Sequence, residues 1–217
     1  MCKVSIYSCD EGFVLTSSRD ISKTREHSLP PRLLNINDVK ILSPVDPQGG
    51  GSWIGVSSDL AACLLNHSGY NIISKESRGL LLIKLLSKEY KVSELRDIIK
   101  EYSPFVLITV DFNSNFKYQH IWDGEKLSSF PILEDQKIFL SRTIYNQKEI
   151  SFYNDSFMSL QYANLSLEKV YNYHLSKVNL HSSTDQRTTS ITQISNLDNI
   201  FMRYTDLINK EDYTLRF

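Results

Sequence analysis

The chain has 217 residues, with 24 Lys and Arg against 25 Asp and Glu, and so a formal net charge of -1. This length suits one large domain with a sizeable core, and because no break in composition separates a second one, we expect a single domain over residues 1–217. The balanced charge, without a basic run that could follow a phosphate backbone, argues against nucleic acid as a partner.

The three cysteines Cys2, Cys9 and Cys63 form neither a CxxC pair nor an even disulfide set, which indicates a reducing compartment. The five histidines are scattered singly, so we expect no metal site and no cofactor. The apolar runs 60–65 and 105–110 are too short to span a bilayer, and no apolar signal-peptide core follows the first residues. These features predict a soluble, cytoplasmic protein without an integral membrane segment.

The first twenty residues predict a β-hairpin. Apolar residues at Val4, Ile6 and 13–15 flank an Asp10-Glu11-Gly12 turn. Antiparallel pairing would bring the Cys2 end of the first strand close to Arg19-Asp20 at the end of the second.

Cys2 has two alternative interpretations. If an aminopeptidase removes Met1, the thiol and a free α-amine share one residue, and their ordinary pKa values of about 8.5 and about 8 allow the amine to act as the base for the thiol. This is the chemistry of an N-terminal nucleophile. Alternatively, Cys2 is a small apolar residue at the start of a buried strand.

The next hundred residues contain several predicted elements. Residues 22–47, with four of the six prolines, predict a surface loop. Gly49-Gly50-Gly51 predicts a glycine-rich turn into the next strand or, alternatively, a backbone that approaches another chain or a ligand closely. The remaining predicted elements are strands over 53–56, 61–66, 105–112, 118–122, 126–132 and 137–143, a helix over 80–90, and a second helix capped by Ser93 and ending before Pro104. Asn66, at the end of a buried strand, is either an oxyanion donor or a turn cap.

Residues 146–178 predict helical structure, in which Ser166 caps a helix with an apolar face that includes His174. On such a face His174 is interpreted as a packed core histidine rather than a catalytic one. Residues 187–194 and 200–204 predict a second β-hairpin.

Several short motifs, in their order and spacing, resemble the NRDE family, which includes transport and Golgi organization protein 2. They are Met1-Cys2, Ser18-Arg19-Asp20, Gly50-Gly51-Ser52-Trp53-Ile54-Gly55-Val56, Leu65-Asn66, Ser77-Arg78-Gly79 and Arg187-Thr188-Thr189-Ser190. The chain departs from the family pattern at Ser18, where the family has Asn, and at Ile21, where it has Glu.

The resemblance implies an α+β fold similar to N-terminal nucleophile hydrolases: a four-layer αββα sandwich of two antiparallel sheets between helices. It also implies a set of site residues. Cys2 would attack an amide carbonyl, Arg19 would favour the thiolate, Asp20 would orient the amine or substrate, and Asn66 would stabilise the oxyanion. Arg78 and Arg187 would bind a substrate carboxylate or, alternatively, form structural ion pairs, and Trp53 would contact substrate.

Three functions are compatible with this resemblance. The first is hydrolysis of a carbon-nitrogen bond in a small amide, and the second is non-catalytic binding or carriage of an apolar ligand such as a lipid or haem in the same fold. In a third, purely structural role, Cys2 would be buried and unreactive. The sequence favours no particular oligomeric state.

Overall fold

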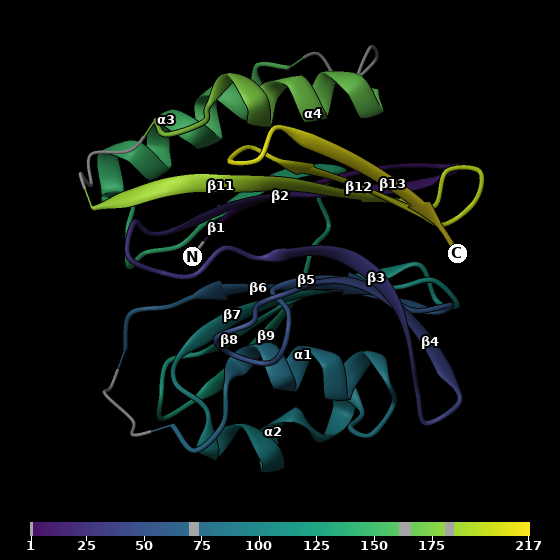
Figure 1. Cartoon of the computed structure of the whole chain (residues 1–217). Helices are drawn as coiled ribbons and strands as arrows, with labels where there is room; N and C mark the ends of the chain where they lie inside the picture. Colours follow the sequence, from purple (N-terminus) through teal and green to yellow (C-terminus); the bar gives the residue numbers. More distant parts are fainter. Residues whose placement is uncertain (1, 70–73, 161–165, 181–184) are drawn as a thin grey trace. The chain divides into compact units, whose positions relative to one another are not determined.

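The structure, a computed structural model, describes residues 2–69, 74–160, 166–180 and 185–217 (Figure 1). Its contacts divide the chain into two compact units. The first unit consists of Met1–Arg25 and Glu134–Phe217, and the second of Glu26–Leu133. Each unit contains one antiparallel sheet and its own helices.

The sheet of the first unit has six strands in the order β10-β1-β2-β11-β12-β13. Their bounds are β1 Cys2–Cys9, β2 Gly12–Ser22, β10 Gln136–Leu140, β11 Gln186–Ser195, β12 Phe201–Asp206 and β13 Glu211–Arg216. The predicted opening hairpin is confirmed as β1 and β2, and the predicted second hairpin as β11 and β12. The edge strand β13 was not predicted, because its sequence alternates charged and apolar residues only briefly.

Two helices, α3 (Gln147–Met158) and α4 (Leu167–Ser176), cover one face of this sheet (Figure 1). The predicted cap Ser166 is confirmed, since its side chain accepts a hydrogen bond from the Lys169 backbone N–H. Aromatic side chains dominate the core between helices and sheet, which includes Tyr7, Val14, Leu140, Tyr145, Tyr153, Phe157, Val170 and Tyr173.

The sheet of the second unit has seven strands in the order β3-β4-β5-β6-β7-β8-β9. Their bounds are β3 Leu29–Ile36, β4 Val39–Val45, β5 Ile54–Val56, β6 Leu60–Asn66, β7 Phe105–Asp111, β8 Phe116–Trp122 and β9 Leu127–Pro131. The predicted surface loop over 22–47 is therefore wrong. Prolines are tolerated in β3 because it is an edge strand, and Asn37 and Asp38, both at positive φ, make the tight turn into β4.

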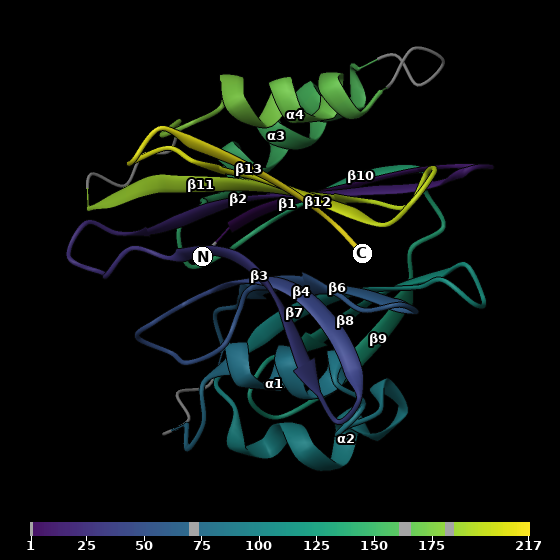
Figure 2. The same ribbon diagram turned by 45° about the vertical axis from the view of Figure 1, so that its right-hand side comes forward.

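Helix α1 (Arg78–Leu86) lies on one face of this second sheet (Figure 2). The predicted helix after it is broken into a 3-10 turn Val92–Glu94, the short α2 (Leu95–Ile98) and a second 3-10 turn Ile99–Glu101. Ser93 lies inside the first of these turns, so its predicted capping role is wrong. Leu95, Ile99 and Tyr102 of this segment are buried in the core with the leucines of α1.

Among the described residues, every helix is too short or too polar to cross a bilayer.

Candidate functional site

The register of the first sheet places Cys2 directly opposite Arg19 on the neighbouring strand. On the other side of β2, Arg19 is directly opposite Ser190 of β11. Directly opposed residues of an antiparallel pair belong to the same face of the sheet, with Cβ atoms about 4.5–5.5 Å apart. The backbone therefore lines up Cys2, Arg19 and Ser190 in one row across three strands; for Cys2 the structure describes the backbone.

A β-bulge in β11 decides which face carries Arg187. Thr188 is opposite Asp20 and Ser190 is opposite Arg19, so Thr189 is the extra residue, and its hydroxyl donates to the Arg19 carbonyl at 3.3 Å. In a regular strand, residues 187 and 190 would belong to opposite faces. The bulge restores the alternation, and Arg187, opposite Ile21, shares the face of Arg19.

Asp20 belongs to the other face of the sheet, the one covered by the helices. Its Oδ2 accepts a hydrogen bond of 2.6 Å from the Tyr145 hydroxyl, and its Oδ1 accepts one of 2.6 Å from the Thr188 hydroxyl. The Lys3 Nζ lies 3.6 Å from Oδ2. Asp20 is therefore on the face opposite to that of Arg19, where Tyr145 and Thr188 bind its two carboxylate oxygens.

Lys3 connects this carboxylate to two further segments. Its ammonium donates to the Tyr145 hydroxyl and to the Lys177 carbonyl just after α4, both at 3.1 Å. On the other side, Thr188 and Asn179 exchange two hydrogen bonds of 2.7 and 2.9 Å. We call Lys3, Asp20, Tyr145 and Thr188 the buried ionic network. Sequence reasoning missed three of its members, and a lysine inside the predicted opening strand was the available signal.

His174 of α4 is buried between two serines on the same face. Its Nε2 is 2.8 Å from the Ser5 hydroxyl and its Nδ1 is 2.7 Å from the Ser18 hydroxyl. Burial, together with the nearby positive charge of Lys3, lowers the pKa of His174 to about 3. The imidazole is therefore neutral and ties α4 to β1 and β2, which confirms its interpretation as a core histidine.

The other candidate residues belong to the second unit. Asn66 is the last residue of β6, opposite Phe105. Arg78, the first residue of α1, donates from Nη1 to the Pro104 carbonyl at 2.7 Å. Trp53 is buried immediately before β5. The structure thus groups Cys2, Arg19, Asp20 and Arg187 in the first unit and the remaining three in the second.

The two glycine motifs of the second unit pack against each other. A Cβ on Gly51 would lie 2.1 Å from the Gly79 carbonyl carbon, and the Ser52 N–H donates to the Gly79 carbonyl at 3.2 Å. The predicted glycine-rich turn before the strand is confirmed, and within it the backbone of Gly51 closely approaches the start of α1. This contact explains Gly51 and Gly79 as packing residues.

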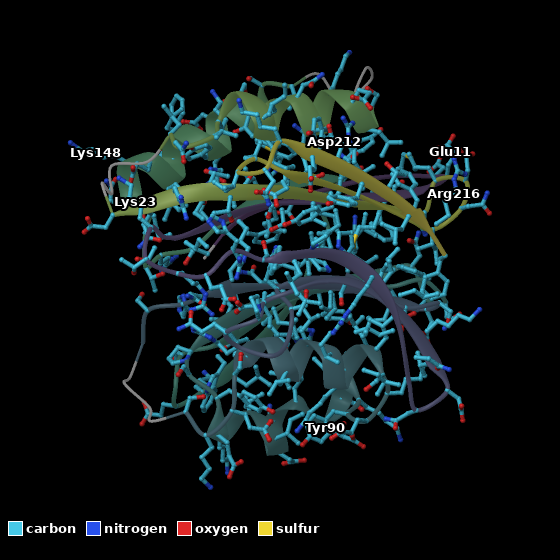
Figure 3. All side chains as sticks on the ribbon, in the orientation of Figure 1. Glu11, Lys23, Tyr90, Lys148, Asp212 and Arg216 are labelled. Carbon is cyan, nitrogen blue, oxygen red and sulfur yellow. The ribbon has the colours of Figure 1, made fainter. Side chains whose placement is uncertain are left out.

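The first unit also has a surface cavity of about 350 Å³ beside α3. Lys148, labelled in Figure 3, is one of its lining residues. The others are Glu149, Phe152, Tyr153, Asn179 and Leu180. The sequence did not predict this cavity, because its wall joins α3 to the segment that follows α4.

A model of the Transport and Golgi organisation 2 family matches residues 1–214. No curated protein sequence matches the chain. Among solved structures, the chain is similar to an arginine-to-leucine variant of conjugated bile acid hydrolase from Clostridium perfringens, with 12% sequence identity, a TM-score of 0.64, and coverage of 99% of this chain and 92% of that chain.

At this identity the likeness shows the fold alone. The bile acid hydrolase has the N-terminal nucleophile hydrolase fold, and the two antiparallel sheets with few helices described above match it. The chain therefore has an α+β fold of the N-terminal nucleophile hydrolase type and belongs to the Transport and Golgi organisation 2 family.

Proposed function

We propose that this protein hydrolyses a carbon-nitrogen bond in a small amide, with Cys2 as an N-terminal nucleophile. The observation that carries the proposal is the register of β1 and β2, which pairs Cys2 with Arg19 in a fold of the N-terminal nucleophile hydrolase type. A buried guanidinium next to a thiol favours the thiolate, which is the reactive form.

The mechanism requires removal of Met1, so that Cys2 carries a free α-amine. The amine takes the thiol proton, the sulfur forms a bond to the amide carbonyl carbon, and the resulting oxyanion needs a hydrogen-bond donor. When this tetrahedral intermediate collapses, its carbon-nitrogen bond breaks, and the departing amine takes the proton from the Cys2 ammonium. Water activated by the same amine then hydrolyses the thioester, releasing a carboxylic acid and regenerating the thiol.

The remaining residues take roles that follow from their positions or from the family motif. Arg187 shares the face of Arg19 and is the candidate for contacting substrate, whereas Asp20 is a positioning residue within the buried ionic network. Asn66 remains the predicted oxyanion donor. Arg78 and Trp53 remain predicted substrate contacts.

The test has two measurements on protein from its native host. Intact mass shows whether Met1 is absent, and hydrolysis of a panel of small acyl p-nitroanilides, followed by release of p-nitroaniline, shows turnover. We expect Met1 to be absent and turnover to be lost in Cys2→Ala. The matched control is Cys9→Ala, which removes a half-buried thiol at the other end of the same strand and should retain turnover. Retention of Met1, or turnover in Cys2→Ala equal to wild type, would refute the mechanism.

The cavity beside α3 supports a second candidate, non-catalytic binding of an apolar ligand such as a lipid. Its volume of about 350 Å³ and its Phe152 and Leu180 side chains suit a small apolar molecule. A fluorescent fatty acid should bind the wild-type protein and lose affinity in Phe152→Asp. Equal binding by both proteins would exclude this cavity as the site.

We further propose that the protein works in the cytoplasm. The three cysteines form neither a CxxC pair nor an even disulfide set, as expected in a reducing compartment. Fractionation of native cells, with antibody detection, would test this.

A further inference from the structure

The cavity beside α3 is lined by both apolar and hydrogen-bonding side chains, all of them from the first unit. Phe152 and Leu180 are each 48% exposed, so a molecule in the cavity can reach both of them. An alkyl chain that covers these two side chains removes apolar surface from water, which is favourable. The polar lining residues then decide what the other end of such a ligand must be.

Asn179 contributes a hydrogen-bond donor to the lining. Its side-chain oxygen accepts from the Thr188 backbone N–H at 2.7 Å, and its own backbone N–H donates to the Thr188 hydroxyl at 2.9 Å. A backbone N–H can bond only to the oxygen end of a side-chain amide, so these contacts fix which end of Asn179 faces Thr188. The NH2 end is therefore the one that remains for a ligand, and it has no partner within the described part of the chain.

The charges around the cavity favour an anion. Lys148 lines the cavity, and its ammonium has no ion-pair partner among the residues that the structure describes. A second ammonium, that of Lys177, lies 5.0 Å from the centre of the Phe152 ring. The carboxylate of the lining residue Glu149 already accepts a hydrogen bond of 2.8 Å from the Asn146 backbone N–H at the start of α3. Two positive charges are therefore close to one negative charge that is already hydrogen-bonded.

We propose that the cavity beside α3 binds an alkyl chain that ends in a carboxylate, with the carboxylate at Lys148 and Asn179 and the chain against Phe152 and Leu180. This inference rests on the second candidate function, binding of an apolar ligand in the same cavity, and narrows its ligand class. A carboxylate only accepts hydrogen bonds, so it complements the Lys148 ammonium and the Asn179 NH2 group, which only donate. The volume of about 350 Å³ is near the lower limit for small-molecule sites and suits a chain of medium length.

The first arm of the test compares three probes that share the same alkyl chain: decanoate, 1-decanol and decylammonium. Backbone amide shifts in two-dimensional NMR spectra of the full chain give both the affinity and the place of binding. We expect decanoate to shift the amides of Phe152 and Leu180 and to bind about fivefold or more tightly than decylammonium, with 1-decanol between them. Equal affinities for decanoate and decylammonium would overturn the proposal.

The second arm changes the two donors. Asn179→Asp keeps an oxygen for the Thr188 N–H and tolerates the positive φ, but it replaces the NH2 group with a negative charge, so decanoate affinity should fall about tenfold or more. Lys148→Ala should weaken decanoate about threefold, whereas the matched control Lys169→Ala, on the exposed surface of α4, should bind decanoate like wild type. Melting curves show that each variant is folded, and unchanged decanoate affinity in Asn179→Asp would overturn the assigned carboxylate contacts.

The outcomes separate this proposal from the candidate function on which it rests. If all three probes bind in the cavity with the same affinity, the carboxylate ligand is excluded and binding of an apolar ligand stands. If none of them shifts the amides of Phe152 and Leu180, the cavity is not a ligand site and both ideas are refuted, while amide hydrolysis at Cys2 is unaffected.

Discussion

The Lys3 Nζ lies 3.6 Å from the Asp20 Oδ2, and the two side chains are 1% and 0% exposed. Lys3 follows Cys2 in the sequence and Asp20 follows Arg19. Both Lys3 and Asp20 belong to the sheet face that the helices cover. Tyr145 completes the contact by accepting a hydrogen bond from Lys3 and donating one to Asp20. The contacts of Lys3, Asp20 and Tyr145 therefore stabilise, from the helix-covered face, the strand ends that carry the proposed nucleophile Cys2 and Arg19.

The first prediction concerns this ion pair. Lys3→Met should lower the free energy of unfolding by about 3–5 kcal/mol, because it leaves the Asp20 carboxylate buried without a compensating charge. Urea unfolding followed by circular dichroism measures the change. The matched control is Lys75→Met, which breaks the exposed pair with Glu101 and should leave the free energy of unfolding nearly unchanged, because water screens that pair.

The double variant Lys3→Met/Asp20→Asn sharpens this test. Removing both charges should recover part of the loss seen in Lys3→Met alone, because no uncompensated charge then remains buried. Strictly additive losses in the two single variants would show that the two charges are not coupled.

The second prediction concerns the pH dependence of stability. Burial lowers the pKa of His174 to about 3, whereas a histidine in the unfolded chain titrates near about 6.5. Below that value the unfolded chain binds a proton that the folded protein does not, so the stability contributed by neutral His174 is complete above pH of about 6.5 and is lost as pH falls toward about 3.

Denaturant unfolding between pH 7 and about pH 4.5 checks this expectation. His174→Gln should flatten the slope by up to about 1.4 kcal/mol per pH unit. Ser18→Ala is the control, since it weakens the same contact but retains the titrating ring. Equal slopes in wild type and His174→Gln would contradict a neutral buried imidazole.

The third prediction concerns the contact between Gly51 and Gly79. A Cβ on Gly51 would lie 2.1 Å from a backbone carbon and 2.4 Å from a backbone oxygen, so the start of α1 must move. Gly51→Ala should therefore cost about 3 kcal/mol or more in unfolding free energy. Gly50→Asn is the control, because Gly50 has a positive φ that Asn tolerates and its nearest contact is 3.9 Å away. A small loss in Gly51→Ala, no larger than in the control, would show that the two segments separate readily.

The fourth prediction concerns the charge of Arg19. Arg19→Gln should disfavour the thiolate form of Cys2 and slow its alkylation by iodoacetamide at neutral pH about tenfold. Peptide mass spectrometry of Met1-processed protein gives the rate, and its pH profile gives the thiol pKa. Arg19→Lys should recover most of the rate, and the exposed Arg142→Gln should not change it. An unchanged pH profile of alkylation in Arg19→Gln would show that the Arg19 guanidinium does not influence the ionisation of the Cys2 thiol.

Local patterns in the sequence determined most of the elements. The opening hairpin, the buried strand β6, the helix α1 and the cap of α4 all follow from alternation, helical periodicity and capping residues that lie within a few positions of one another. The hairpin of β3 and β4 escaped prediction because prolines disguise an edge strand. The pairing of Cys2 with Arg19 was also accessible, since a short turn sets the register of a hairpin.

Only the tertiary structure decided how the two faces of the first sheet differ. The bulge at Thr189 brings Arg187 to the face of Arg19, and Lys3 finds partners 142 and 174 residues away along the chain. His174 likewise bonds serines that are 156 and 169 residues away. Such pairings depend on which distant segments pack together and on the removal of water between them, and neither is encoded in the spacing of neighbouring residues.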